Sequence, residues 1–247
     1  MFKIGVKLTP FKIDKVYIGQ ISDYADYIEL YIDLKKTNAD QLNFDIPVAT
    51  VHITQFCGGV NFADSSREKI NLVALEKALN IANSFKSEKV IFHPELIQHD
   101  LCSIEHLIEF LIRNHDCRMK IENMPLSSNG IRHLGANYAE IKEMVLQTKI
   151  GFCLDYAHAC EYTTAMRLNP ENVIKELLLL NPTHFHLVDT DLGKVFDINY
   201  NENHLNLGKG NIDIEMIKKN IPNGSEVTIE TPQDLEYQIE EIRYLKY

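Results

Sequence analysis

Residue types that bind divalent metals recur at the ends of short apolar runs in this chain. The runs read TVH, VIFH, MKIE, GFCLD, HFH and VTIE, and they end at His52, His93, Glu122, Asp155, His186 and Glu230. Successive members lie about 30 to 45 residues apart, which is enough for a strand, a helix and two turns. Their side chains fit Zn²⁺, Mn²⁺ or Co²⁺, and the sequence does not choose among these ions. The spacing predicts a metal site built from the ends of successive strands.

Eight strand-like runs alternate with helical patterns along the chain. These runs are Lys3–Leu8, Tyr27–Ile32, Pro47–His52, Lys89–His93, Arg118–Glu122, Lys149–Asp155, Thr183–Val188 and Glu226–Thr231. Their nearly continuous apolar content is typical of a buried parallel sheet. In a (β/α)₈ barrel, the carboxyl ends of all strands meet on one face. We therefore predict an α/β protein, a single TIM barrel domain over residues 1–247, with the metal-binding side chains gathered on that face.

The helical patterns between these runs are less regular. Apolar residues recur at helical spacing in Arg67–Ser84, Ile104–Ile112, Glu171–Leu180 and Asp234–Leu245. Pro170 suits the first turn of the third of these helices. The segment Lys35–Asn43 is weakly helical at best, so the second repeat is expected to be short.

Composition limits the classes of function. The 247 residues match one barrel of about 250, and 45% hydrophobic content is enough for a full core. There is no apolar run of the ~18 residues that a membrane span needs, and no signal peptide is evident. The five cysteines lack CxxC spacing, so we expect reduced thiols in the cytoplasm. The net charge of −10 disfavours nonspecific binding to a phosphate backbone, and the oligomeric state is left open.

Further polar residues cluster near the strand ends. In LDYAH, a tight turn or opening helical turn would aim Asp155 and His158 at one centre. The loop after HFHLVD contains Glu202 and His204, followed by Gly208 and Gly210, which allow a turn that bulkier residues would resist.

Each of these residues also has an ordinary structural interpretation. A lone histidine at a strand end is more often a satisfied polar residue than a ligand, and Glu122 alone is compatible with a buried pair with a lysine. The group favours a metal, because several carboxylates on one barrel face would repel one another without a cation. Glu29 is expected either inside the barrel or facing substrate. Four other histidines are expected at the surface: His99, His106, His115 and His133.

The motifs IENM, GFCLDYAHA, HLVD, ENHLNLGKGNID and TIETP occur in an order and spacing that resemble the xylose-isomerase-like barrel superfamily. That superfamily contains endonuclease IV and many sugar isomerases and epimerases, and the resemblance covers essentially the whole chain. In the sugar branch it implies one divalent cation, Zn²⁺ or Mn²⁺, held by Glu122, Asp155, His186 and Glu230. It also implies that the two glutamates act as acid and base and that His158 touches the substrate.

Resemblance to endonuclease IV implies a larger site with up to three zinc ions. Its nine ligand positions fall on His52, His93, Glu122, Asp155, His158, His186, Glu202, His204 and Glu230, with Glu202 replacing the usual aspartate. The DNA-inserting pair of that nuclease falls on Gln55 and Phe56, so only Phe56 remains to wedge between base steps. The loop IDLKKTNAD has two lysines and no arginine, so the footprint of a DNA-binding protein is faint.

The sequence favours a metal-dependent sugar or sugar-phosphate isomerase or epimerase with a small carbohydrate substrate. The alternative is an apurinic-site endonuclease acting on DNA, and a further alternative is a lyase or dehydratase of the same superfamily. Candidate substrate contacts are His52, His93, Phe56 and Lys209, although a solvated loop lysine is the more ordinary interpretation of the last. There is no arginine between Arg167 and Arg243, where epimerases of the family often place one, so no particular ketose is indicated.

Overall fold

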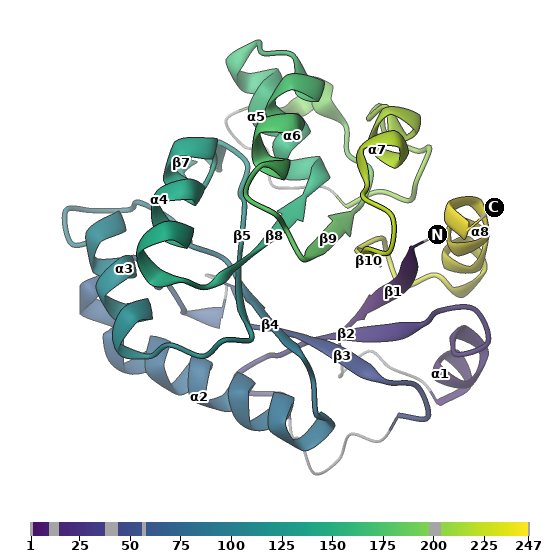
Figure 1. The fold of residues 1–247 in the computed structure, drawn as a ribbon, viewed down its shortest axis with the longest axis horizontal. Helices are drawn as coiled ribbons and strands as arrows, with labels where there is room; N and C mark the ends of the chain where they lie inside the picture. The colour runs from purple at the N-terminus through teal and green to yellow at the C-terminus, as the bar shows by residue number, and fades with distance from the viewer. Residues whose placement is uncertain (1, 10–14, 38–43, 56–57, 198–203, 247) are drawn as a thin grey trace.

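A closed barrel of eight parallel strands forms the centre of the protein (Figure 1). The computed structural model describes residues 2–9, 15–37, 44–55, 58–197 and 204–246. The barrel strands are β1 (Lys3–Leu8), β2 (Tyr27–Tyr31), β3 (Val48–His52), β4 (Lys89–Phe92), β5 (Met119–Glu122), β8 (Gly151–Asp155), β9 (His184–Leu187) and β10 (Glu226–Ile229). Strand β1 pairs with both β2 and β10, which closes the ring. The predicted (β/α)₈ TIM barrel and its eight strands are confirmed.

Helices surround the barrel on its outer side (Figure 1). They are α1 (Lys15–Ile21), α2 (Glu68–Phe85), α3 (Ile104–Arg113), α4 (Tyr138–Thr148), α5 (Tyr156–Met166), α6 (Pro170–Leu178), α7 (Ile214–Asn220) and α8 (Leu235–Lys246), with short 3₁₀ turns η4 (Ser65–Arg67) and η5 (Leu192–Lys194). The four helical patterns found in the sequence correspond to α2, α3, α6 and α8, with ends that differ by at most two residues. Of the weakly helical segment Lys35–Asn43, residues 38–43 lie outside the described residues.

A small hairpin extends the barrel after β5. Its strands β6 (Ser127–Ser128) and β7 (Ile131–Arg132) pair in antiparallel fashion. Pairing between Leu96 and His133 attaches the hairpin to the loop after β4. The hairpin therefore stands over the carboxyl end of the barrel, beside the candidate site. It was not predicted from the sequence.

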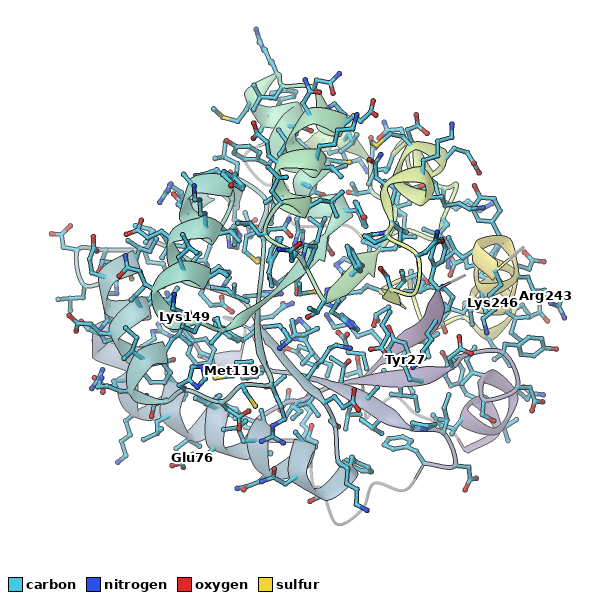
Figure 2. All side chains as sticks on the ribbon, in the orientation of Figure 1. Tyr27, Glu76, Met119, Lys149, Arg243 and Lys246 are labelled. Atoms are coloured by element: carbon cyan, nitrogen blue, oxygen red, sulfur yellow. The ribbon has the colours of Figure 1, made fainter. Side chains whose placement is uncertain are left out.

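Alternation along the strands gives the barrel a polar interior. On β2, Ile28 and Leu30 point outward into the apolar layer under the helices, whereas Tyr27 and Glu29 share the inward face. The Tyr27 hydroxyl lies 3.1 Å from Thr228 Oγ1 on β10. Figure 2 shows side chains between the strands and the helices as well as inside the ring of strands, with Tyr27 among the strands. Polar groups inside the barrel offer hydrogen bonds to charged side chains, so residues such as Glu29 can be buried there.

No helix in the described part of the chain has both the length and the apolar character that a bilayer crossing requires.

Candidate metal centre

Six candidate ligands meet at the carboxyl end of the barrel. His52, Glu122 and Asp155 are the final residues of β3, β5 and β8, and His186 is the third residue of β9. His93 and Glu230 each follow a strand by one residue. All six are buried, and four of them are fully inaccessible to solvent. The structure therefore brings together the residues with which the six apolar runs end.

Glu122 lies at the centre of this group. Its Oε2 atom is 3.2 Å from His52 Nε2, 3.3 Å from His93 Nε2 and 3.2 Å from His186 Nδ1. Its Oε1 atom is 3.3 Å from His158 Nδ1. Three groups of ligand atoms that contain Glu122 lie within 4.8 Å of one another, which is close enough to share an ion.

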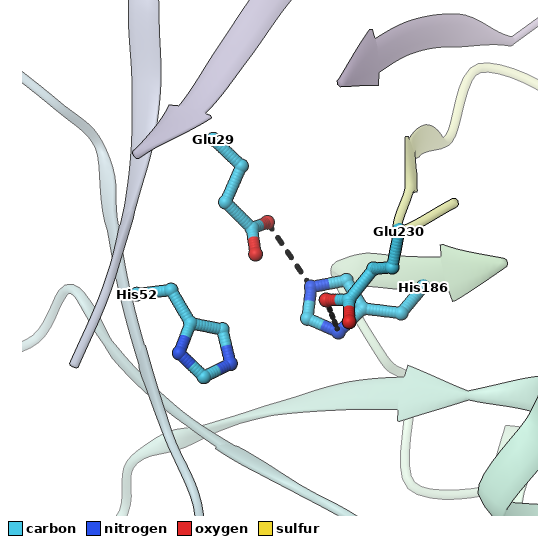
Figure 3. A group of neighbouring side chains, drawn as sticks. All are labelled: Glu29, His52, His186 and Glu230. Atoms are coloured by element: carbon cyan, nitrogen blue, oxygen red, sulfur yellow. Dashed lines mark hydrogen bonds and ion pairs between the residues drawn. The ribbon is translucent and has the colours of Figure 1, made fainter. Parts of the chain in front are cut away.

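A fourth group includes a residue that sequence reasoning left open. Ligand atoms of Glu29, His52, His186 and Glu230 lie within 4.8 Å of one another (Figure 3). His186 Nδ1 is 2.8 Å from Glu230 Oε1, and its Nε2 is 3.0 Å from Glu29 Oε2. Glu29 is fully buried inside the barrel, so it supports the site from below instead of facing the cavity.

Asp155 has a structural role in addition to its place in the site. Its carboxylate accepts a 2.7 Å hydrogen bond from the backbone N–H of His158 and so caps α5. Asn123, the residue after Glu122, binds the backbone of Asp155 in both directions, at 2.8 and 2.9 Å. Asn123 was missed in the sequence, where its only signal is the dipeptide Glu-Asn. Together these bonds fix the relative positions of the ends of β5 and β8.

Three histidines are oriented by backbone carbonyls. The Nδ1 atoms of His52, His158 and His204 lie 2.9, 2.7 and 2.7 Å from the carbonyl oxygens of Ile53, Asn123 and Glu230 respectively. A carbonyl only accepts hydrogen bonds, so each Nδ1 is a donor and Nε2 is the ring nitrogen that a metal could take. Metal-binding histidines are commonly fixed in this way through their second nitrogen.

Several buried ligand atoms at this site form no hydrogen bond with the described residues. They are Glu29 Oε1, His93 Nε2, Glu122 Oε1, Asp155 Oδ2 and His186 Nδ1. Leaving such an atom unsatisfied costs about 1–3 kcal/mol. A cation would compensate all the carboxylate oxygens at once, and imidazole nitrogens with carboxylate oxygens suit Zn²⁺ or Mn²⁺. The donor set therefore fits a divalent ion.

Without a metal, protons on Asp155 and His186 offset part of the negative charge of the carboxylates at this site. Burial, against the opposing effect of His158 and together with the charges of Glu122 and Glu230, raises the pKa of Asp155 to about 7. For His186, burial acts to lower the pKa, but the surrounding acidic groups outweigh it and hold the pKa well above its usual value. A divalent ion bound to these groups would replace protons.

A cavity of about 940 Å³ opens above the candidate ligands. Its described lining includes His93, His204 and Glu230, together with Lys7 from β1. Most of the other polar groups are uncharged: Thr9, Tyr31, Gln55, Ser128, Asn129, Thr231 and Gln233. Such a lining offers many hydrogen bonds to a small polar ligand.

His133 corrects a prediction, because it is not a surface residue. It is buried, lines the cavity, and its Nε2 lies 2.9 Å from Ser128 Oγ on the hairpin. Glu95 also lines the cavity and is buried, with a backbone φ of +76° that non-glycine residues rarely adopt.

The remaining candidates lie elsewhere or outside the described residues. Phe56 and Glu202 fall outside them. Lys209 is not brought to the central cavity; its Nζ lies 5.6 Å from the centre of the Tyr237 ring, at a separate depression of about 470 Å³ beside α7 and α8. His204 does reach the site, with Nδ1 3.9 Å from Glu230 Oε2.

Asp189 organises the loop that carries His204. Its carboxylate accepts hydrogen bonds from the backbone N–H groups of Gly208, Gly210 and Ile212 at 2.9, 2.9 and 3.1 Å. Gly208 has a φ of +79°, and a Cβ atom at Gly210 would lie 2.3 Å from the carbonyl oxygen of Thr190. Both glycines therefore permit a turn that other residues would resist, as the sequence indicated.

A family model described as xylose isomerase-like TIM barrel matches residues 13–247. The chain belongs to this family. A comparison of the sequence with curated proteins found no significant match. The family includes metal-dependent enzymes of different activities, so membership by itself leaves the reaction open.

Solved structures with the same fold come from several enzymes. Endonuclease IV from Thermus thermophilus is 18% identical with a TM-score of 0.69, covering 99% of this chain and 97% of that one. A second protein from T. thermophilus, soaked with ZnCl₂, is 20% identical with a TM-score of 0.68, covering 98% and 97%. The 3-keto-D-glucoside 4-epimerase of E. coli is 13% identical with a TM-score of 0.66, covering 100% and 99%. At these identities the likeness shows the fold alone.

Proposed function

We propose that this chain, as one domain over residues 1–247, is a divalent-metal-dependent sugar isomerase or epimerase. The reaction is proton transfer at a carbon beside a carbonyl group. The observation that carries the proposal is that Glu122 and Glu230 both approach His186 Nδ1, at 3.2 and 2.8 Å, at the base of a large polar cavity. Two carboxylates beside one ligand position give an acid and a base around a single substrate.

The ion would be held by the four-residue set Glu122, Asp155, His186 and Glu230. A bound divalent ion supplies Lewis acidity to the carbonyl group of the substrate. Glu230 lines the cavity, so it can take the proton from the neighbouring carbon. Return of that proton by Glu230 to the adjacent carbon isomerises the sugar. Inversion requires Glu122 in its protonated form to deliver a proton from the other side, after which Glu230 releases its proton to solvent and Glu122 takes one up. His158 contacts a substrate oxygen in this scheme.

The cavity supports a carbohydrate substrate. Its uncharged polar lining offers both donors and acceptors to hydroxyl groups, for example from Tyr31, Gln55 and Gln233. The fold is shared with a 3-keto-D-glucoside 4-epimerase, a protein that acts on a keto sugar. The net charge of −10 also suits a neutral small molecule better than a polyanion.

The test is proton exchange in D₂O. Protein loaded with Mn²⁺ or Zn²⁺ is incubated with a panel of ketoses and keto sugars, and deuterium beside the carbonyl is detected by NMR. Glu230→Gln is expected to abolish exchange. Glu226→Gln is the matched control, because Glu226 begins the same strand at the opposite end of the barrel. The proposal is wrong if folded, metal-loaded protein exchanges no member of the panel, or if Glu230→Gln exchanges at the full rate.

A second candidate function is favoured by the size of the ligand cluster. His52, His93 and His158 surround Glu122 in addition to the four-residue set, as a site for up to three zinc ions would require. This is the alternative of an apurinic-site endonuclease. It predicts close to three zinc ions per chain and nicking of an abasic-site duplex. A metal content near one ion, without nicking at high protein concentration, would end it.

A further inference from the structure

Lys7 is a buried cation beside the candidate metal ligands. It lies on β1, where its backbone pairs in register with Glu29 of β2. Its Nζ is 2.6 Å from Glu230 Oε1 and 3.8 Å from Glu29 Oε1. The ammonium also lies 5.9 Å from the centre of the Tyr31 ring. Carboxylates and an aromatic ring therefore hold it at the edge of the cavity, which it lines.

Lys7 can do more than balance the charge of Glu230, because its ammonium group can also donate hydrogen bonds to a ligand. An ammonium group has three N–H donors, and among the described residues only Glu230 accepts a hydrogen bond from it. The side chain is 13% exposed, and that exposure is toward the cavity it lines. A donor is therefore available to a ligand placed between Lys7 and the candidate metal ligands.

Lys7 also differs from every other described residue that lines the cavity. Within that described lining, no other lysine or arginine is present. The acidic lining residues are Glu95 and Glu230, with Glu29 and Glu122 buried close behind. One cation among these carboxylates can stabilise a single negative oxygen. A phosphate dianion carries two charges, and the described lining holds no second lysine or arginine to pair with it.

We propose that Lys7 is a catalytic residue that donates a hydrogen bond to the substrate oxygen that becomes negatively charged, and that the substrate is a keto sugar with no phosphate group. This inference rests on the proposed function. When a carboxylate takes the proton from the carbon beside the carbonyl, the C–H electron pair forms the C=C bond of the enediolate. The π pair of the carbonyl group moves to its oxygen, which gains the charge that Lys7 faces. Return of the proton restores the carbonyl group.

Lys7 and a divalent ion would also share Glu230. Oε1 of Glu230 lies 2.6 Å from Nζ of Lys7, so a divalent ion held by Glu230 would compete with the ammonium for this carboxylate. Removing the ammonium should therefore strengthen metal binding while it weakens binding of a negatively charged oxygen. A residue with a merely structural role would not change these two affinities in opposite directions.

The experiment measures binding by calorimetry, so it does not depend on knowing the substrate. The probe is glycolohydroxamate, whose two adjacent oxygens imitate an enediolate, added to Mn²⁺-loaded protein. Lys7→Met is expected to weaken probe binding at least tenfold and to bind Mn²⁺ at least as tightly as the wild type. Neutral glycolamide should bind the two proteins alike. Lys3→Met is the matched control on the same strand, because Lys3 pairs with Glu226 at the far end of the barrel.

The outcomes separate this inference from the proposed function. Unchanged probe affinity in Mn²⁺-loaded Lys7→Met would overturn the role of Lys7, even if ketoses exchange deuterium. Inorganic phosphate that binds the wild type tightly, and only when Lys7 is present, would overturn the substrate class. Lys7-dependent probe binding without exchange of any ketose would support the oxyanion site and refute the proposed function. If Lys7→Met does not fold, Lys7→Gln retains a donor to Glu230 and should show the same loss.

Discussion

The carboxylate of Glu29 lies 3.0 Å from Nε2 of His186, and both side chains are fully buried under the cavity. The same oxygen of Glu29 lies 3.0 Å from His184 Nε2 and from Thr228 Oγ1. Glu29 therefore receives the Nε2 proton of His186, which directs Nδ1 toward Glu122 and Glu230. A carboxylate behind a histidine ligand fixes its tautomer and increases its basicity.

Glu29→Gln should weaken binding of the divalent ion by about 10- to 100-fold, the usual effect of losing a carboxylate behind a metal-bound histidine. Competition titration with a chelating dye measures the affinity. Glu226→Gln is the control, because Glu226 pairs with lysines at the opposite end of the barrel. Equal affinities for both variants would show that Glu29 does not position His186.

Asp155→Asn should separate capping from metal binding. The amide oxygen of asparagine can still accept the N–H of His158 and cap α5, but the charge is lost. Metal affinity should therefore fall by about a hundredfold or more, since even indirect changes cost 10- to 100-fold. Metal-free protein at about pH 8 should be no less stable than the wild type, because a buried charge is removed.

The comparison for this variant is Asp213→Asn, which changes the cap of α7 far from the ligands. Metal content by mass spectrometry and thermal unfolding measure the two effects. Full metal content in Asp155→Asn would remove Asp155 from the ligand set.

The stability that a bound metal adds to the folded protein should increase with pH. The folded pKa of Asp155, about 7, exceeds its ordinary value of 3.8, so the stability that its proton contributes is lost as pH rises through that interval. The pKa of His186 is also raised, so its contribution is lost at higher pH. The lowered pKa values of Glu29 and Glu122 affect stability only in acid.

Metal-free protein should therefore lose stability from about pH 4 to about pH 7 as Asp155 loses its proton, and further above about pH 6.5 through His186, while metal-bound protein, whose ligands are deprotonated, should not. The difference in Tm between loaded and chelator-treated protein should widen across this range. Asp155→Asn should show a weaker dependence. A Tm difference that narrows with rising pH would contradict the assigned protonation states.

Gly210→Ala should disturb the loop that carries His204. The added methyl group would lie 2.3 Å from both Asp189 Oδ1 and the carbonyl oxygen of Thr190. We expect destabilisation by about 1–3 kcal/mol, the usual cost of overpacking, together with weaker probe binding. Gly19→Ala is the control, because a Cβ there has open space in α1. Denaturant unfolding of the two variants measures the difference, and equal stabilities would contradict the close packing.

The barrel and the meeting of the candidate ligands were predictable because both depend on strand ends. A side chain such as Glu122 at the end of an apolar run has its position set by topology, which the sequence pattern reveals. The helix α5 was anticipated only as an opening turn, because its buried residues, including His158, Cys160 and Thr163, give little helical contrast. Lys7 and His133 could not be assigned, since their roles depend on contacts with segments distant in sequence, Glu230 for one and Leu96 for the other.

The seam between β1 and β10 has a consequence for biosynthesis. Lys7 and Glu230 meet across it, so the site combines residues from the first and the last strand of the barrel. A nascent chain would lack β10 and the carboxylate of Glu230 until that last barrel strand has been translated. Complete loading of the proposed ion would then follow synthesis of β10, and a fragment that stops short of this strand should release the ion readily.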